Sequence, residues 1–84
     1  MDRKGEEVRS FVVSRIAELV GAAPEEIDPA AELSTYGIDS TDLLTLLFDI
    51  EERFATKLHP GLFVEAATID VLAERIGAEL ATGA

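Results

Sequence analysis

Residues 37–54 read GIDSTDLLTLLFDIEERF and set the architecture of the whole chain. Asp39 is a preferred residue for capping the start of a helix, and Asp42, three positions later, can complete a reciprocal cap. The apolar residues that follow recur at spacings of three and four, which is typical of one stripe along a helix: Leu43, Leu46, Leu47, Ile50 and Phe54. The stretch therefore predicts a helix from Asp39 to about Phe54 or Ala55, with one face turned inward.

The segments on either side show further helical patterns. Apolar residues at helical spacing predict a helix over about residues 6–20, and Gly21 ends it. A last helix is predicted over about residues 69–80, with Thr68 as its N-cap. A short helical piece of one or two turns is predicted around residues 62–66.

The connection between the first two helices, residues 22–38, is long for a small domain. Its isolated apolar residues predict a loop pinned across the helices: Ile27, Leu33, Tyr36 and Ile38. No segment shows the sustained period-two alternation of a strand. We therefore predict an all-α fold, a small four-helix bundle of three main helices and one short helix with a long first loop. A chain of 84 residues is expected to form a single domain over residues 1–84, with an ordered core at about residues 6–80.

The composition excludes several classes of function. Hydrophobic residues make up 48% of the chain, which is too many for an intrinsically disordered protein. The absence of cysteine rules out disulfides, thiolate zinc sites and thiol nucleophiles. A formal net charge of −10 argues against nucleic acid and against anionic membranes, and favours protein partners with basic patches. With no apolar run long enough to span a bilayer and no secretory segment, we expect a cytoplasmic protein.

The sequence offers few groups for catalysis. Its only histidine, His59, lies between Leu58 and Pro60 in a short connector, where a surface loop residue is the expected interpretation. Neither a calcium-binding loop nor a glycine-rich phosphate loop is present. We therefore expect no catalytic residue and no metal site in this chain.

Ser40 is a candidate for modification because it falls in the first turn of the predicted central helix. The exposed N–H groups there and the positive end of the helix dipole favour a phosphate ester on its hydroxyl. A second interpretation is that Ser40 merely assists the helix cap, with Asp39 doing most of the capping, which leaves Ser40 without a chemical role.

One further face of this helix is apolar. Ser40, Leu44 and Phe48 fall at positions i, i+4 and i+8, so they form one line along the helix. Together with the inward stripe they exceed the roughly 100° of apolar arc that a bundle helix needs. Leu44 and Phe48 are therefore candidates for exposed anchors of a protein-docking face. The alternative is that they pack under the long loop, against Ile38 or Tyr36.

The tetrapeptide Gly37-Ile38-Asp39-Ser40 at the start of an acidic amphipathic helix resembles the acyl/peptidyl carrier protein family. The resemblance covers nearly the whole chain and is strongest to freestanding bacterial acyl carrier proteins. It implies that Ser40 carries a covalent 4′-phosphopantetheine arm, installed from coenzyme A by a phosphopantetheinyl transferase that uses magnesium, with Asp39 in the recognition motif. The thiol of the arm then holds acyl or polyketide cargo as a thioester, and the protein itself is not an enzyme.

The resemblance also assigns roles along the helix. It implies a partner-docking side made of four residues and an inward cargo pocket made of three: Asp42, Leu44, Phe48 and Glu51 for docking, and Leu46, Ile50 and Phe54 for cargo. Thr41 replaces the usual Leu or Met after the serine, and Thr45 stands where an acid is common in bacterial fatty-acid carriers. These departures favour a specialised polyketide or mixed peptide–polyketide pathway over fatty-acid synthesis.

The expected partners are the transferase and a ketosynthase, acyltransferase or adenylating enzyme of the pathway, with the carrier as a monomer. Two alternatives remain open. The chain could be a peptidyl or aminoacyl carrier protein. It could also be a non-carrier acidic helical adaptor in which Ser40 is unmodified or phosphorylated. A hydrolase is the least favoured class, because no base is recognised near Ser40.

Overall fold

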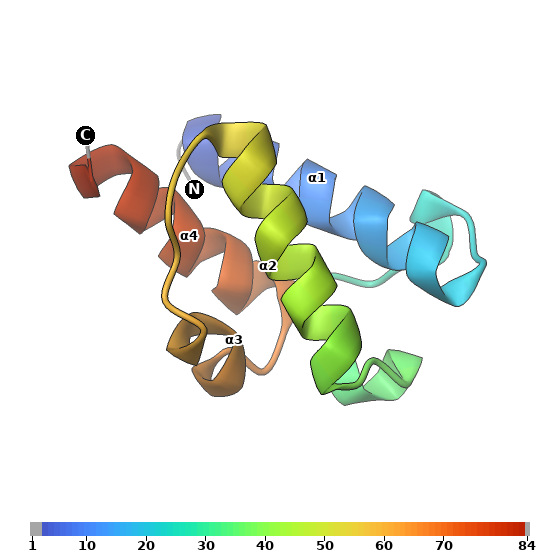
Figure 1. Ribbon diagram of the computed structural model, residues 1–84. Helices are drawn as coiled ribbons and strands as arrows, with labels where there is room; N and C mark the ends of the chain where they lie inside the picture. Colours follow the sequence, from blue (N-terminus) through green and yellow to red (C-terminus); the bar gives the residue numbers. More distant parts are fainter. Residues whose placement is uncertain (1–2, 84) are drawn as a thin grey trace.

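The computed structural model describes residues 3–83, apart from the side chains at positions 4, 64, 65 and 81–83. It contains four α-helices, α1 (Arg3–Val20), α2 (Ser40–Phe54), α3 (Gly61–Glu65) and α4 (Ile69–Gly83), as Figure 1 shows. The long loop adds two 3₁₀ turns, η1 (Pro24–Glu26) and η2 (Leu33–Tyr36). Within residues 3–83 no strand forms beyond one isolated bridge, so the predicted all-α bundle is confirmed. None of these helices combines the length and hydrophobicity that crossing a bilayer requires.

The helix boundaries agree with the sequence-based prediction to within one residue except at the start of α1 and at the end of α4, which extends to Gly83 instead of about residue 80. Helix α1 begins at Arg3, three residues before the predicted start at about residue 6. The periodicity of apolar residues misses these positions because Arg3, Lys4 and Gly5 contribute no large apolar side chain to the stripe. The first apolar contact with the core is made by Val8, which is fully buried.

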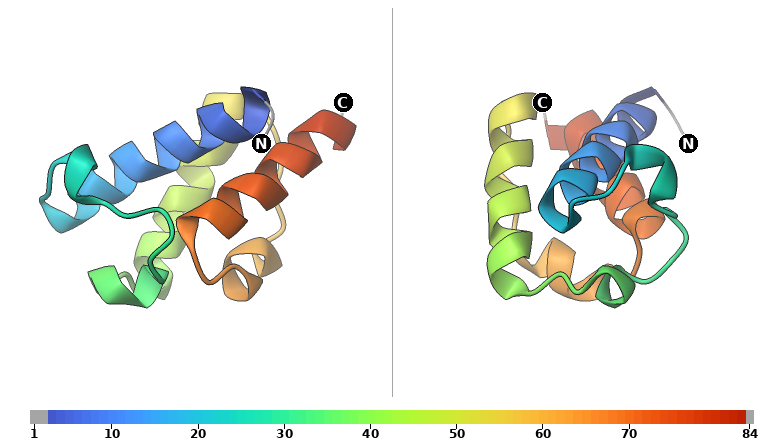
Figure 2. Two further views of the ribbon diagram at one scale, coloured as in Figure 1. Left: turned by 180° about the vertical axis from the view of Figure 1, so that it is seen from behind. Right: turned by 90° about the vertical axis from the view of Figure 1, so that its right-hand side faces the viewer.

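The core lies where α1 packs along α4 and α2 crosses both. Figure 2 shows this arrangement in its right-hand view, in which α2 stands along one side of the paired α1 and α4. Large, fully buried side chains come from all three helices: Val8, Val12 and Ile16 of α1, Leu46 and Ile50 of α2, and Ile69, Leu72 and Ile76 of α4. The three amphipathic stripes therefore meet in one core, and α3 only closes its edge.

Local capping fixes the start of α2 where the sequence predicts it. The side chain of Asp39 accepts a hydrogen bond from the N–H of Asp42 at 2.9 Å, and Asp42 accepts one from the N–H of Asp39 at 3.4 Å. Just before this cap, Gly37 adopts the left-handed conformation (φ 68°), which a residue with a Cβ rarely adopts. At α4, Thr68 Oγ1 accepts from the N–H of Val71 at 3.1 Å, as its predicted N-cap role requires.

The long loop is held against the helices rather than free. Ile27 and Leu33 are buried, and the N–H of Leu33 donates to the carbonyl of Ala67 at 2.9 Å. The hydroxyl of Tyr36 accepts from the N–H of Asp28 at 2.7 Å and donates to its carbonyl at 3.3 Å. The predicted pinning is confirmed, and it gives Ser40 a fixed position at the end of the loop.

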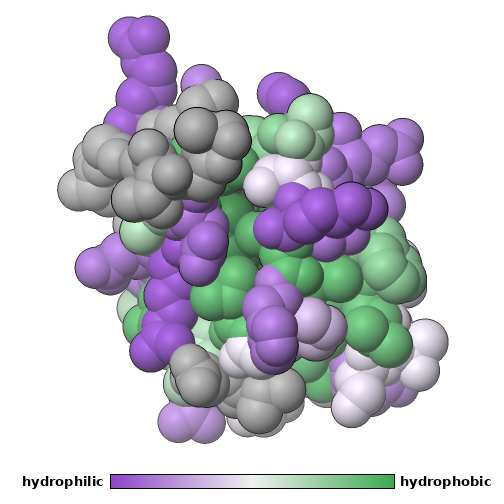
Figure 3. All heavy atoms as spheres, turned by 60° about the vertical axis from the view of Figure 1, so that its left-hand side comes forward, coloured by the Kyte–Doolittle hydropathy of each residue, from purple (hydrophilic) through white to green (hydrophobic). Residues whose placement is uncertain are grey.

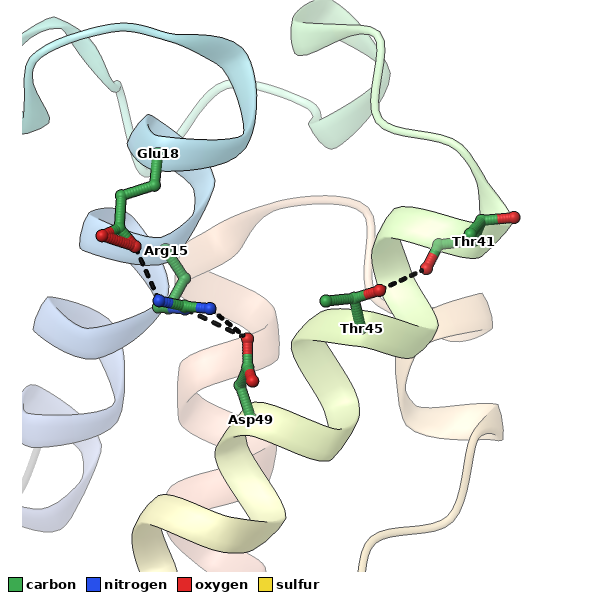
Figure 4. A network of polar contacts seen from close by, with 5 residues as sticks. All are labelled: Arg15, Glu18, Thr41, Thr45 and Asp49. Atoms are coloured by element: carbon green, nitrogen blue, oxygen red, sulfur yellow. Dashed lines mark hydrogen bonds and ion pairs between the residues drawn. The ribbon is translucent and has the colours of Figure 1, made fainter.

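Ion pairs join the helices at the surface. Arg15 of α1 donates to Asp49 of α2 through Nη2 at 2.6 Å and Nε at 3.1 Å, and to Glu18 through Nη1 at 2.6 Å (Figure 4). The hydrogen bond to Asp49 raises the pKa of Arg15 above its ordinary value, so the guanidinium stays charged. Arg9 pairs with Asp70 at 2.9 Å and so links α1 to α4. Each such exposed pair contributes only about 0–1 kcal/mol.

Repulsion among the acids is expected to outweigh these pairs, since 17 acidic residues face 7 lysines and arginines. The melting temperature should therefore rise when NaCl is increased from about 0.01 M to about 1 M, which shortens the Debye length from about 30 Å to about 3 Å. Circular dichroism melts at neutral pH measure this. A constant melting temperature would contradict net repulsion among the surface charges, and a falling one would show that the ion pairs dominate.

Candidate functional site

Ser40 opens α2 and its side chain is exposed to solvent. Asp39 fills the capping position before it, and within residues 3–83 the Ser40 hydroxyl forms no hydrogen bond. Asp39 and Asp42 supply the cap between them, and the Ser40 side chain takes no part in it within the described residues. The hydroxyl is left available for modification from outside.

An apolar cavity of about 220 Å³ lies beside Ser40, between α2 and the start of α3. Its walls are built by residues of both segments: Ser40, Leu43, Leu44, Leu47, Pro60 and Phe63. Figure 3 brings the side of the molecule with α3 forward and shows hydrophobic surface between polar side chains there. An arm attached to Ser40 would thus meet an apolar groove next to its point of attachment.

The three residues predicted to form the cargo pocket lie on the inward side of α2, as expected, but apart from the cavity beside Ser40, and their cargo role stays a prediction. Leu46 and Ile50 are 1% and 0% exposed, because their positions on α2 face the core with α1 and α4. Phe54 stands near the far end of α2, edge-on to Phe11 with ring centroids 5.9 Å apart. None of these three residues lines the cavity beside Ser40.

Two wall residues of the cavity, Pro60 and Phe63, were missed in the sequence analysis. The signal that could have found them is weak: a proline before a short helix and one aromatic residue within it. A larger open depression of about 530 Å³ lies between α1 and the end of α2, with Arg53 in its wall. Arg53 lies thirteen residues along α2 from Ser40, about 20 Å at the helical rise, so this depression is not part of the same site.

The apolar line on α2 is exposed as predicted. Leu44 is 47% exposed and Phe48 is 61% exposed, so the alternative in which they pack against Ile38 or Tyr36 is wrong. Beside this line, Thr45 Oγ1 donates to the carbonyl of Thr41 at 3.1 Å (Figure 4). We refer to Ser40, Leu44 and Phe48 as the docking face, and its docking role stays a prediction.

The two acids predicted to take part in docking are both engaged within the fold. Asp42 is half-buried and completes the cap of α2. Glu51 is half-buried, and its Oε2 accepts a hydrogen bond from the N–H of Leu58 at 2.7 Å. A partner would therefore meet these carboxylates already in contact with backbone N–H groups.

Groups for catalysis do not converge on Ser40. His59 is exposed, and its Nδ1 accepts a hydrogen bond from the N–H of Gly61 at 2.9 Å. A serine nucleophile is activated by a hydrogen-bonded base, whereas the Ser40 hydroxyl has no such partner in the described part of the chain. Over the same residues, no cluster of histidine and carboxylate side chains could hold a metal ion.

Comparison with known proteins gives one consistent result. Residues 10–76 match the family described as "Phosphopantetheine attachment site". Over 72 residues the chain is 32% identical to "Polyketide synthase PksN" of Bacillus subtilis (strain 168), a match that spans 86% of this chain and 1% of that protein.

Two solved structures share both fold and sequence with the chain. A free-standing peptidyl carrier protein from an uncharacterized secondary metabolic pathway of Acinetobacter baumannii is 29% identical, with a TM-score of 0.84 over 94% of this chain and 99% of that one. An acyl carrier protein of Anabaena sp. PCC 7120, with a variant phosphopantetheinylation-site sequence, is 27% identical, with a TM-score of 0.81 over 93% and 89%.

Proposed function

Since the chain belongs to the phosphopantetheine attachment family, whose members are non-catalytic carriers, we propose that its arm is joined to Ser40. The observation that carries this proposal is the exposed hydroxyl of Ser40 at the start of α2, which has no hydrogen-bond partner among the described residues and lies beside an apolar cavity. We further propose that residues 1–84 act as one carrier domain.

The residues around Ser40 fit a phosphodiester-linked arm. The helix start favours an anionic group on the hydroxyl, and Asp39 keeps the cap intact when Ser40 is modified. The apolar walls from Leu43, Leu47 and Phe63 suit the hydrocarbon part of the arm. When attached, the arm supplies the thiol that a chain without cysteine lacks.

The modification is a group transfer in which Ser40 is the acceptor. Ser40 Oγ forms a bond to the phosphorus of coenzyme A that carries the pantetheine portion. The bond from that phosphorus to the oxygen bridging the diphosphate breaks, adenosine 3′,5′-bisphosphate leaves, and the hydroxyl proton passes to a base of the transferase. Within the described residues the chain contributes an exposed acceptor and no base at Ser40, which supports a separate phosphopantetheinyl transferase as the first partner.

The cargo that fits best is an acyl or polyketide intermediate held as a thioester and presented to a ketosynthase or acyltransferase. The similarity to a polyketide synthase of Bacillus subtilis supports this class of pathway. A second candidate, aminoacyl or peptidyl cargo loaded by an adenylating enzyme, is supported by the similarity to the Acinetobacter baumannii peptidyl carrier protein. Leu44 and Phe48 of the docking face would contact these enzymes.

The test is intact-mass spectrometry after incubation with coenzyme A and a broad-specificity phosphopantetheinyl transferase. We expect the mass of one arm to be added to the whole population. A non-carrier adaptor predicts an unchanged mass with several transferases and partner binding that coenzyme A treatment does not alter. The species found on the arm of protein isolated from its host then distinguishes acyl from aminoacyl cargo.

A further inference from the structure

The connection between α2 and α3, residues 55–60, is tied to one residue of α2. The N–H of Ala55 and the N–H of Thr56 both donate to the backbone carbonyl of Glu51, the latter at 3.0 Å. The N–H of Leu58 donates to the side chain of the same Glu51, at 2.7 Å from Oε2. Three backbone N–H groups that follow α2 therefore donate hydrogen bonds to Glu51. The bond accepted by its carboxylate is the one nearest to α3 along the chain.

The position of Leu58 helps to set the position of α3. Leu58 is 7% exposed, so it anchors the connection in the core. Directly after it, the carbonyls of His59 and Pro60 accept the first hydrogen bonds of α3, from Leu62 at 3.0 Å and from Phe63 at 3.1 Å. Pro60 and Phe63 are the α3-side walls of the cavity beside Ser40. A shift of the connection at Leu58 would thus move one wall of that cavity.

We propose that Glu51 is a positioning residue, whose carboxylate holds the connection through Leu58 so that Pro60 and Phe63 form the second wall of the cavity beside Ser40. The importance of that cavity rests on the proposed carrier function. This role differs from the docking role predicted for Glu51, because docking to a basic partner would use its charge. Positioning uses the oxygen as a hydrogen-bond acceptor, with the charge strengthening the bond.

A comparison of Glu51→Gln with Glu51→Ala distinguishes the positioning role from the docking role. Glutamine keeps a side-chain oxygen at the same reach but carries no charge, whereas alanine removes both. The matched controls are Glu52→Gln and Glu52→Ala, because Glu52 is the exposed neighbour on the same helix. Amide hydrogen exchange of the unmodified protein, followed by NMR, reports on the connection and on α3 without any partner enzyme.

We expect Glu51→Ala to speed exchange at Leu58 and in α3 on the order of tenfold, the factor that corresponds to losing a hydrogen bond to a charged group. Exchange in Glu51→Gln should speed up by only about threefold, because glutamine keeps an oxygen acceptor but forms a neutral hydrogen bond of about half the strength. Core amides of α1 and α4 should be unchanged in every variant, which excludes general unfolding. Equal acceleration in both Glu51 variants, or none in Glu51→Ala, would overturn the proposal.

The transferase assay adds a functional readout. We expect kcat/KM for modification of Ser40 to fall in Glu51→Ala and to be restored in Glu51→Gln. An equal fall in the two variants would identify Glu51 as a charged docking residue and overturn the positioning role. If the native protein gains no mass at all, the carrier function fails, while the exchange experiment still decides how Glu51 acts on α3.

Discussion

Replacement of Ser40 by alanine is expected to abolish the addition of the arm completely while leaving the fold intact. The loss is complete because no other atom at this position can form the phosphodiester bond. The stability effect should stay within about 0.5 kcal/mol, since Ser40 is exposed and its hydroxyl makes no hydrogen bond in the described part of the chain. Alanine also has a higher helix propensity than serine. Intact mass and a thermal melt measure the two effects.

Two controls make the result specific. Ser34 is also exposed and lies six residues earlier, so Ser34→Ala should be modified like the native protein. Asp39→Ala removes the oxygen that accepts from the N–H of Asp42, and should cost about 0.5–2 kcal/mol of stability. A destabilised but still modified Asp39 variant would show that loss of the cap does not by itself prevent modification. Full addition of an arm to Ser40→Ala would place the attachment on another residue and disprove the assignment.

The helices could be predicted from the sequence because their signals are local. The cap of α2 depends on Asp39 and Asp42, which are three residues apart, and its inward stripe follows from helical spacing alone. The exposure of Phe48 could also be predicted, since the apolar arc of α2 is wider than one packed face requires. Ser40 could be singled out because its position in the first turn is fixed by the same cap.

The cavity could not be predicted, because it depends on where α3 lies in space. Pro60 and Phe63 follow Ser40 by twenty residues or more, and no spacing rule relates them to it. The stripe of α2 predicts only that Leu46 and Ile50 face inward, and both are buried against the core that α2 shares with α1 and α4. The same limit applies to Glu51, since a sequence shows its charge but not the N–H of Leu58 that it binds.

Phe48→Ala and Ile50→Ala should have opposite effects, although the two residues are separated by a single position on α2. Phe48 is 61% exposed, so its truncation should lower the free energy of unfolding by less than about 1 kcal/mol. Ile50 is 0% exposed, and Ile50→Ala should cost about 2–5 kcal/mol, because the surrounding core cannot close the cavity that it leaves. Urea denaturation of the unmodified protein measures both changes.

The effects of the two substitutions on cargo transfer should be in the opposite order to their effects on stability, with the larger loss in Phe48→Ala. In the modified protein, Phe48→Ala should slow transfer of cargo to a partner enzyme by about tenfold or more, the loss expected when an aromatic anchor of an interface is truncated. Leu44→Ala should give a smaller loss of the same kind, because its side chain offers less area. Ile50→Ala, assayed where it remains folded, should transfer normally, since its side chain cannot reach a partner. If Phe48→Ala instead loses as much stability as Ile50→Ala, its ring belongs to the core and the docking face defined by Ser40, Leu44 and Phe48 does not exist.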